Sequence, residues 1–392
     1  MPQSVTDEAT LLAFCERHGL PVRRLGTTLF GRGIHAIDLP GRDLPSRGQA
    51  GRGPAARDAA PPIVITSGSH ATEPAGVLAA LTLAKELNLD RRVVIVPIRD
   101  PLGWEGYANY LSLAAGKSVT LAPDTDLGEL LAELGTVLYS EDDLVISQVG
   151  EVAFLARPVA KAGRGPMDIW KHLHDVLDAD QGVVTTLQSR RLVLPENLPD
   201  VEGCGVYNHA FTAWVTPEGG VGNFNRLFSF DDAPVEVAVI GDLVRELRPE
   251  LVIDLHESQG SKFSIFAHPA LGPGATEVYF GATGAVFAAG HPIERVEDIV
   301  PIIGAAHAAK FTDEGGGVFT GLNEFPGQGW QFTHLCAELG AVTVVNETGR
   351  WQPLATRVEQ QVLAARGAIF AYLNAGAFER GRAAAAGRTA HG

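Results

Sequence analysis

The segment that begins at residue 62 limits the fold most, because it alternates apolar strands with a helix. Ile63-Val64-Ile65 is a short apolar run of β-branched residues, which is typical of a strand buried on both faces. A helical pattern follows over 74–88, and Val93–Val96 is a second apolar strand. This order of strand, helix and strand predicts a βαβ unit, and therefore a parallel or mixed sheet with helices on both faces.

The same pattern returns in the second half of the chain. There we expect a helix over 234–247, strands over Leu251–Leu255 and Ala341–Val345, and a helix over 353–373. Residues 111–205 lie between the two halves and combine helix-like with strand-like pieces. We therefore predict one α/β domain over 62–380 that the insertion 111–205 interrupts.

Two further segments flank this domain. Residues 1–61 are expected to hold a short amphipathic helix, two short strands and, over 41–61, a mobile loop rich in Gly, Pro, Arg and Ala. Residues 381–392 consist mostly of Ala, Gly and Arg, so we expect a flexible tail.

The balance of charges excludes some partners. The chain of 392 residues has 31 Lys and Arg against 46 Asp and Glu, a net charge of −15, which argues against binding to nucleic acid or to anionic membranes. It has no apolar run long enough for a membrane span and no visible secretory signal. Cys15, Cys204 and Cys336 are far apart among apolar neighbours, so we expect free thiols in a cytoplasmic protein.

Polar side chains follow two of the predicted strands. His70 and Glu73, three residues apart, lie on the loop after the first strand, where both can reach one metal ion. Asp254 and His256 share one face at the end of a later strand. Either they form a hydrogen-bonded pair beside solvent, or His256 binds a metal that Asp254 helps to orient. His291-Pro292-Ile293-Glu294 repeats the first spacing with no clear strand before it, and we interpret it as a chance match.

Two more segments add a carboxylate and a cation. Glu347 follows the strand Ala341–Val345, where it either emerges from the sheet without a role or acts as a general base. Asn225 and Arg226 lie in a mostly apolar stretch; Arg226 either pairs with a local carboxylate or binds one from a substrate. Because strand ends converge at one edge of such a sheet, we expect these side chains to lie close together.

Four polar segments follow one another along the chain: His70 with Glu73, Asn225 with Arg226, His256, and Glu347. In this order they resemble the carboxypeptidase A-like zinc hydrolases, a superfamily that includes the zinc carboxypeptidases and the succinylglutamate desuccinylase and aspartoacylase branch. The resemblance covers roughly 62–110 and 220–372. It implies a mixed, mostly parallel, eight-stranded sheet between helices. It also implies one zinc ion per chain and a role for each matched residue: metal binding for His70, Glu73 and His256, general base for Glu347, and substrate carboxylate binding for Arg226 and Asn225.

The chain departs from this family in one stretch, where an Asn-Pro-Asp-Gly-like sequence reads Arg99-Asp100-Pro101-Leu102-Gly103. The family's oxyanion-stabilising arginine and substrate-covering tyrosine have no evident counterpart. We expect a zinc-dependent, metallocarboxypeptidase-like hydrolase that cleaves an amide or peptide bond in a small carboxylate-bearing substrate. The alternative is an N-acyl amino acid amidohydrolase of the desuccinylase and aspartoacylase type, and a non-catalytic binding protein is a third reading.

Overall fold

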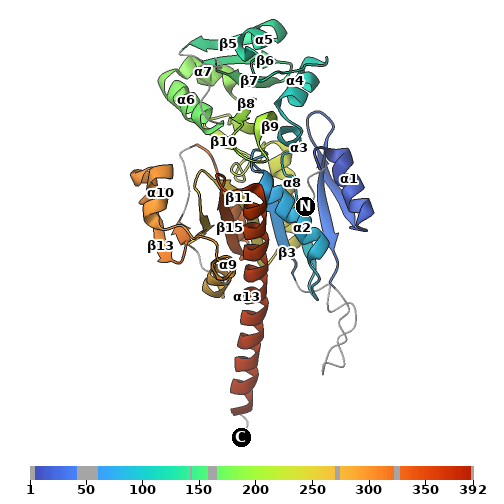
Figure 1. Ribbon diagram of the computed structural model, residues 1–392, viewed down its shortest axis with the longest axis vertical. Helices are drawn as coiled ribbons and strands as arrows, with labels where there is room; N and C mark the ends of the chain where they lie inside the picture. The colour runs from blue at the N-terminus through green and yellow to red at the C-terminus, as the bar shows by residue number, and fades with distance from the viewer. Residues whose placement is uncertain are drawn as a thin grey trace.

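A computed structural model describes residues 5–41, 61–141, 144–157, 166–269, 274–321 and 327–389. A large sheet with its helices lies below a second, smaller sheet, and the long helix α13 (Leu354–Thr389) projects from the lower part (Figure 1). The mobile loop expected over 41–61 lies almost wholly outside the described residues. The described part of α13 includes most of the segment expected as a flexible tail.

The lower sheet has nine strands among the described residues, in the order β1-β2-β4-β3-β11-β15-β12-β14-β13. Four neighbouring pairs are parallel (β4–β3, β3–β11, β11–β15 and β12–β14), and the other four are antiparallel. The strands are β1 (Val22–Thr27), β2 (Gly33–Leu39), β3 (Ile63–Ser67), β4 (Val93–Val96), β11 (Leu251–Ser258), β12 (Phe263–Ala267), β13 (Phe311–Gly315), β14 (Val318–Gly321) and β15 (Val342–Gly349).

The predicted mixed α/β architecture is confirmed, but the predicted eight strands and their mostly parallel order are wrong. The hairpin β1–β2 belongs to the N-terminal extension, yet it adds two antiparallel strands to one edge of the sheet. At the other edge β13 pairs antiparallel with β14. Most of β13 is exposed and polar, so it lacks the apolar run that reveals a buried strand in a sequence.

Alternate residues of the central strands enter two separate cores. Ile63 and Ile65 pack into one core, whereas Val64 packs into the other. This burial on both faces explains why β3 reads as a continuous apolar run. Helices α1 (Glu8–Arg17), α2 (Pro74–Glu86), α9 (Ala275–Ala288) and α13 contribute to the first core, and α8 (Val235–Leu247) and α12 (Phe332–Glu338) contribute to the second.

The upper sheet has the order β10-β9-β8-β7-β6-β5 and packs into cores of its own. Its strands are β5 (Thr136–Glu141), β6 (Leu144–Val149), β7 (Val152–Ala156), β8 (Arg191–Leu198), β9 (Gly205–Val215) and β10 (Val221–Asn223). Most of these strands fall within the segment 111–205, and β9 and β10 extend the sheet beyond it.

The remaining helices of the described residues vary in length from one turn to fourteen residues. They are α3 (Pro101–Trp104), α4 (Tyr107–Ala115), α5 (Leu127–Leu134), α6 (Pro166–Ala179), α7 (Gln181–Leu187), α10 (Val296–Ile303) and α11 (Ala305–Ala308). None of the helices in the described residues combines the length and apolar character needed to cross a membrane.

Candidate metal centre

The loop between β3 and α2 presents His70 and Glu73. Gly68 turns the chain after β3 with a φ of +63°, a left-handed conformation that glycine adopts at little steric cost. Pro74 then occupies the first turn of α2, where its missing N–H group costs no helical hydrogen bond. The local sequence therefore ends the strand, forms a short turn and starts the helix directly after Glu73.

His256 and Glu347 reach the same place from β11 and β15. These strands are parallel neighbours in which His256 pairs with Glu347, and β3 flanks β11 on its other side. Three strand ends therefore meet at one edge of the sheet. Gly76 allows α2 to lie against β11, because a Cβ atom there would come within 2.7 Å of the Leu255 carbonyl oxygen.

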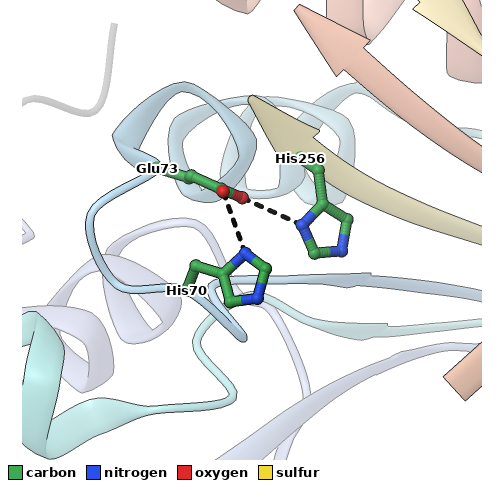
Figure 2. A group of neighbouring side chains, drawn as sticks. All are labelled: His70, Glu73 and His256. Atoms are coloured by element: carbon green, nitrogen blue, oxygen red, sulfur yellow. Dashed lines mark hydrogen bonds and ion pairs between the residues drawn. The ribbon is translucent and has the colours of Figure 1, made fainter. Parts of the chain in front are cut away.

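The Nδ1 atoms of two imidazoles face the carboxylate of Glu73, as Figure 2 shows. His70 Nδ1 lies 2.9 Å from Glu73 Oε1, and His256 Nδ1 lies 2.9 Å from Oε2. One ligand atom from each side chain lies within 4.8 Å of the others, so this group of described residues can hold a metal ion. Imidazole nitrogen and carboxylate oxygen are ligands of zinc and related divalent metals.

The charges within this group depend on one another. Burial raises the pKa of Glu73, but the charges of His70 and His256 outweigh it and hold that pKa well below its usual range. Burial lowers the pKa of His256, but Asp254 and Glu73 outweigh it and hold that pKa well above its usual range. Each ring nitrogen of His256 faces a carboxylate, Nδ1 that of Glu73 and Nε2 that of Asp254. A metal cation bound in this group can replace the proton at Nδ1.

Asp254 lies on the far side of the His256 ring. Its Oδ2 atom is 2.8 Å from His256 Nε2, and Thr66 Oγ1 donates to its Oδ1 atom at 2.6 Å. Burial raises the pKa of Asp254, but His256 and Arg99 lower it to about 2. A carboxylate can only accept, so His256 Nε2 carries the proton and Nδ1 faces the metal-binding group. Both residues are buried, so they do not form a pair beside solvent.

Glu347 is the partly buried carboxyl group next to these ligands. Burial raises its pKa to about 8; the charge of His256 lowers the pKa, while the charges of Glu73 and Glu294 raise it further. A carboxyl group whose pKa lies near neutrality can both take up and release a proton during a reaction.

Asn225 and Arg226 approach from the loop after β10. Asn225 Nδ2 lies 3.2 Å from His256 Nε2. Arg226 is buried, and burial lowers its pKa to about 10, which leaves it charged at neutral pH. Asp231 and Asp232, the local carboxylates weighed as its partners, are exposed.

Two side chains that contact the candidate site residues were not predicted from the sequence. The ring of Phe211, from β9 of the upper sheet, stacks on His70 with 5.3 Å between ring centroids. Arg99 donates from Nη1 to Asp254 Oδ2 at 3.3 Å and to Asn225 Oδ1 at 3.1 Å. The departure at Arg99 from the family pattern marked its segment as unusual, whereas Phe211 carries no sequence signal.

No family model matches this chain, and no curated protein matches it. A comparison with solved structures found matches of low sequence identity. A metallo-carboxypeptidase from Burkholderia cenocepacia is 11% identical with a TM-score of 0.45, and the match covers 94% of this chain and 69% of that one. Carboxypeptidase A from Helicoverpa armigera is 11% identical with a TM-score of 0.45, covering 96% and 74%.

A third solved structure, the murein-tripeptide amidase MpaA from Escherichia coli O157, is 14% identical with a TM-score of 0.39. That match covers 91% of this chain and 94% of the amidase. Two of the three proteins are named carboxypeptidases and the third an amidase.

Proposed function

We propose that this chain is a zinc-dependent hydrolase that cleaves an amide or peptide bond in a small carboxylate-bearing substrate, as a metallocarboxypeptidase does. The observation that carries this proposal is the convergence of two imidazoles and a carboxylate from two strand ends, with the carboxyl of Glu347 opposite His256 in the sheet register. We also propose that residues 62–380 form the hydrolase domain and that the upper sheet covers its site.

In this proposal His70, Glu73 and His256 hold one zinc ion per chain. The donor set fits, because both Nδ1 atoms and the Glu73 carboxylate converge on one point. When bound, zinc polarises a substrate carbonyl and lowers the pKa of a water molecule towards about 7. Asp254 keeps His256 in the tautomer that leaves Nδ1 free for the metal.

Glu347 acts as the general base. Its carboxylate takes the proton from the attacking water and then gives it to the nitrogen of the leaving amine, so one group serves both halves of the reaction. Its position supports this role, because Glu347 pairs in the sheet register with His256, one of the proposed metal ligands.

Arg226 binds the carboxylate of the substrate. A guanidinium group can donate two parallel hydrogen bonds to a carboxylate, and burial strengthens such a charged contact. Asn225 is its neighbour in the chain and contacts the His256 ring. The carboxylate therefore binds at a fixed place relative to the metal, which orients the scissile bond.

The experiment that tests the proposed function is metal analysis followed by a hydrolysis screen. We expect about one zinc ion per chain, since the site offers three ligands for one ion. The zinc-loaded protein is then assayed with dipeptides, N-acyl amino acids and small amides, each with and without a free carboxylate. Hydrolysis of dipeptides supports the peptidase, and hydrolysis of N-acyl amino acids alone supports the amidohydrolase alternative. A protein that retains no metal and hydrolyses nothing overturns both.

Replacing Arg226 tests how the substrate is bound. We expect Arg226→Ala to raise KM for carboxylate substrates by about 10- to 100-fold, the cost of losing hydrogen bonds from a charged donor. The exposed Arg245 provides a matched control, and Arg245→Ala should leave KM unchanged. Equal KM values for Arg226→Ala and the wild-type protein would remove Arg226 from the binding site.

A further inference from the structure

Arg99 is one member of a buried ring of four side chains, the others being Asp254, His256 and Asn225. Its Nη1 atom donates to Asp254 Oδ2 at 3.3 Å and to Asn225 Oδ1 at 3.1 Å. Asp254 Oδ2 in turn lies 2.8 Å from His256 Nε2, and Asn225 Nδ2 lies 3.2 Å from the same nitrogen. Arg99 therefore reaches the His256 ring through Asp254, and its other acceptor, Asn225, packs against the same edge of the ring.

We propose that Arg99 is a positioning residue that holds the metal ligand His256 and the Asn225–Arg226 loop in one fixed arrangement. This inference rests on the proposed function. It extends that function, because it links the metal site to the site for the substrate carboxylate. Arg99 makes this link through Asp254 and Asn225, without itself being a metal ligand or a substrate-binding residue.

The ring joins three separate segments of the chain. Arg99 follows β4, Asn225 follows β10, and Asp254 and His256 belong to β11. A further bond, from Arg99 Nη2 to the Phe224 carbonyl oxygen at 2.9 Å, anchors the loop through its main chain. The loop that carries Arg226 is therefore held by the same guanidinium group that holds Asp254, the hydrogen-bond partner of His256.

The surroundings restrict the guanidinium group to this position. Arg99 is 1% exposed, and its guanidinium carbon lies 4.7 Å from the ring centroid of Phe332 and 5.5 Å from that of Phe228. Cation–π contacts and a buried carboxylate both favour a charged group here. Arginine suits the place better than lysine, because its planar group donates in several fixed directions at once.

The orientation of Asn225 also follows from Arg99. An amide side chain can present either its oxygen or its nitrogen to a neighbour. Because Arg99 only donates, the oxygen of Asn225 faces Arg99 and its nitrogen faces the His256 ring. Loss of Arg99 removes the reason for this orientation, and the loop before Arg226 can then take other arrangements.

Two substitutions test the proposal, and both are measured on the full chain. Arg99→Met removes the charge and all the donors, while Arg99→Lys keeps the charge and loses the planar group. Loss of a partner that orients a metal ligand costs about 10- to 100-fold in metal affinity. We expect the dissociation constant for zinc, measured by competition with a chromophoric chelator, to rise by this factor in Arg99→Met and by less in Arg99→Lys.

A spectroscopic measurement separates positioning from stability. With Co²⁺ in place of zinc, we expect the visible absorption bands of folded Arg99→Met to differ from those of the wild-type protein, because the His256 ring has moved. In the hydrolysis assay, KM for a carboxylate substrate should rise while KM for its uncharged analogue stays the same. Thermal unfolding confirms that each variant is folded before metal binding is compared.

Arg191 provides the matched control. It is a buried arginine that pairs with Glu236 and packs over the Phe224 ring, so Arg191→Met also removes a buried cation near the same loop. We expect Arg191→Met to lose thermal stability and to keep its zinc affinity. The proposal is overturned if folded Arg99 variants bind zinc as the wild-type protein does, or if Arg191→Met weakens zinc binding equally. A wild-type protein that binds no zinc contradicts the proposed function itself.

Discussion

The chain contains two His-x-x-Glu segments that have the same spacing but whose side chains contact different partners. His70 and Glu73 face each other, with 2.9 Å between Nδ1 and Oε1. His291 and Glu294 turn to different partners: His291 Nε2 lies 3.4 Å from Glu359 Oε2, and Glu294 Oε2 accepts a hydrogen bond from Ser264. Among the described residues only the first pair belongs to a group that can hold a metal ion.

The difference arises from what precedes each segment and what lies beside it. The first segment follows β3 and starts α2, so its side chains point to the edge where β11 presents His256. The second segment follows α9, and Ile293 forms only an isolated bridge to β12. Spacing allows two side chains to reach one ion, but a third ligand must come from the surrounding fold.

The largest expected contrast is in metal binding. We expect Glu73→Gln to abolish measurable zinc binding, because the substitution removes a direct ligand and adds an amide nitrogen that only donates. Glu294→Gln, the same change in the other segment, should leave the zinc content unchanged. Metal analysis of both variants after dialysis checks the comparison. Zinc loss from Glu294→Gln, or its full retention in Glu73→Gln, would reverse our assignment of the two segments.

The next contrast separates metal binding from catalysis. We expect Glu347→Gln to keep its zinc and to lower kcat by about 100- to 10,000-fold, the usual contribution of a general base. The amide has nearly the same size but cannot accept the proton. Zinc content and steady-state kinetics are measured on the same preparation. A variant with nearly normal kcat would exclude Glu347 as the base.

The smallest expected effect concerns the second segment, whose Glu294 raises the pKa of Glu347. Glu294→Gln removes this negative charge, so the pKa of Glu347 should fall. The base is active when it is deprotonated, and the acidic limb of kcat/KM should therefore move to lower pH, by about one unit or less. The pH profile of the zinc-loaded variant measures this shift.

The exposed Glu297 lies close by in the sequence, and Glu297→Gln serves as the control. Zinc affects Glu347 equally in all these proteins, so the difference between the profiles reports the removed charge. A profile of Glu294→Gln that is unchanged, or that moves to higher pH, would contradict a direct effect of Glu294 on Glu347.

The sequence predicted the parts of the site that follow the central strands. His70, His256 and Glu347 were predicted as site residues because each follows or ends an apolar run, and parallel strands place their carboxyl ends at one edge. The same apolar runs predicted β3, β4, β11 and β15 with errors only at their ends. The edge strand β13 was missed, because it is short, exposed and polar and gives no apolar signal.

The sequence by itself thus determined the order of the central strands along the chain and the candidate metal ligands, because strand periodicity and local turn chemistry are encoded in adjacent residues. Only the tertiary structure decided which distant groups complete the site. Arg99 meets Asp254 across 155 positions of the chain, and Phe211 reaches His70 from a different sheet. Such contacts depend on how sheets and loops pack together, which no local pattern in the sequence records.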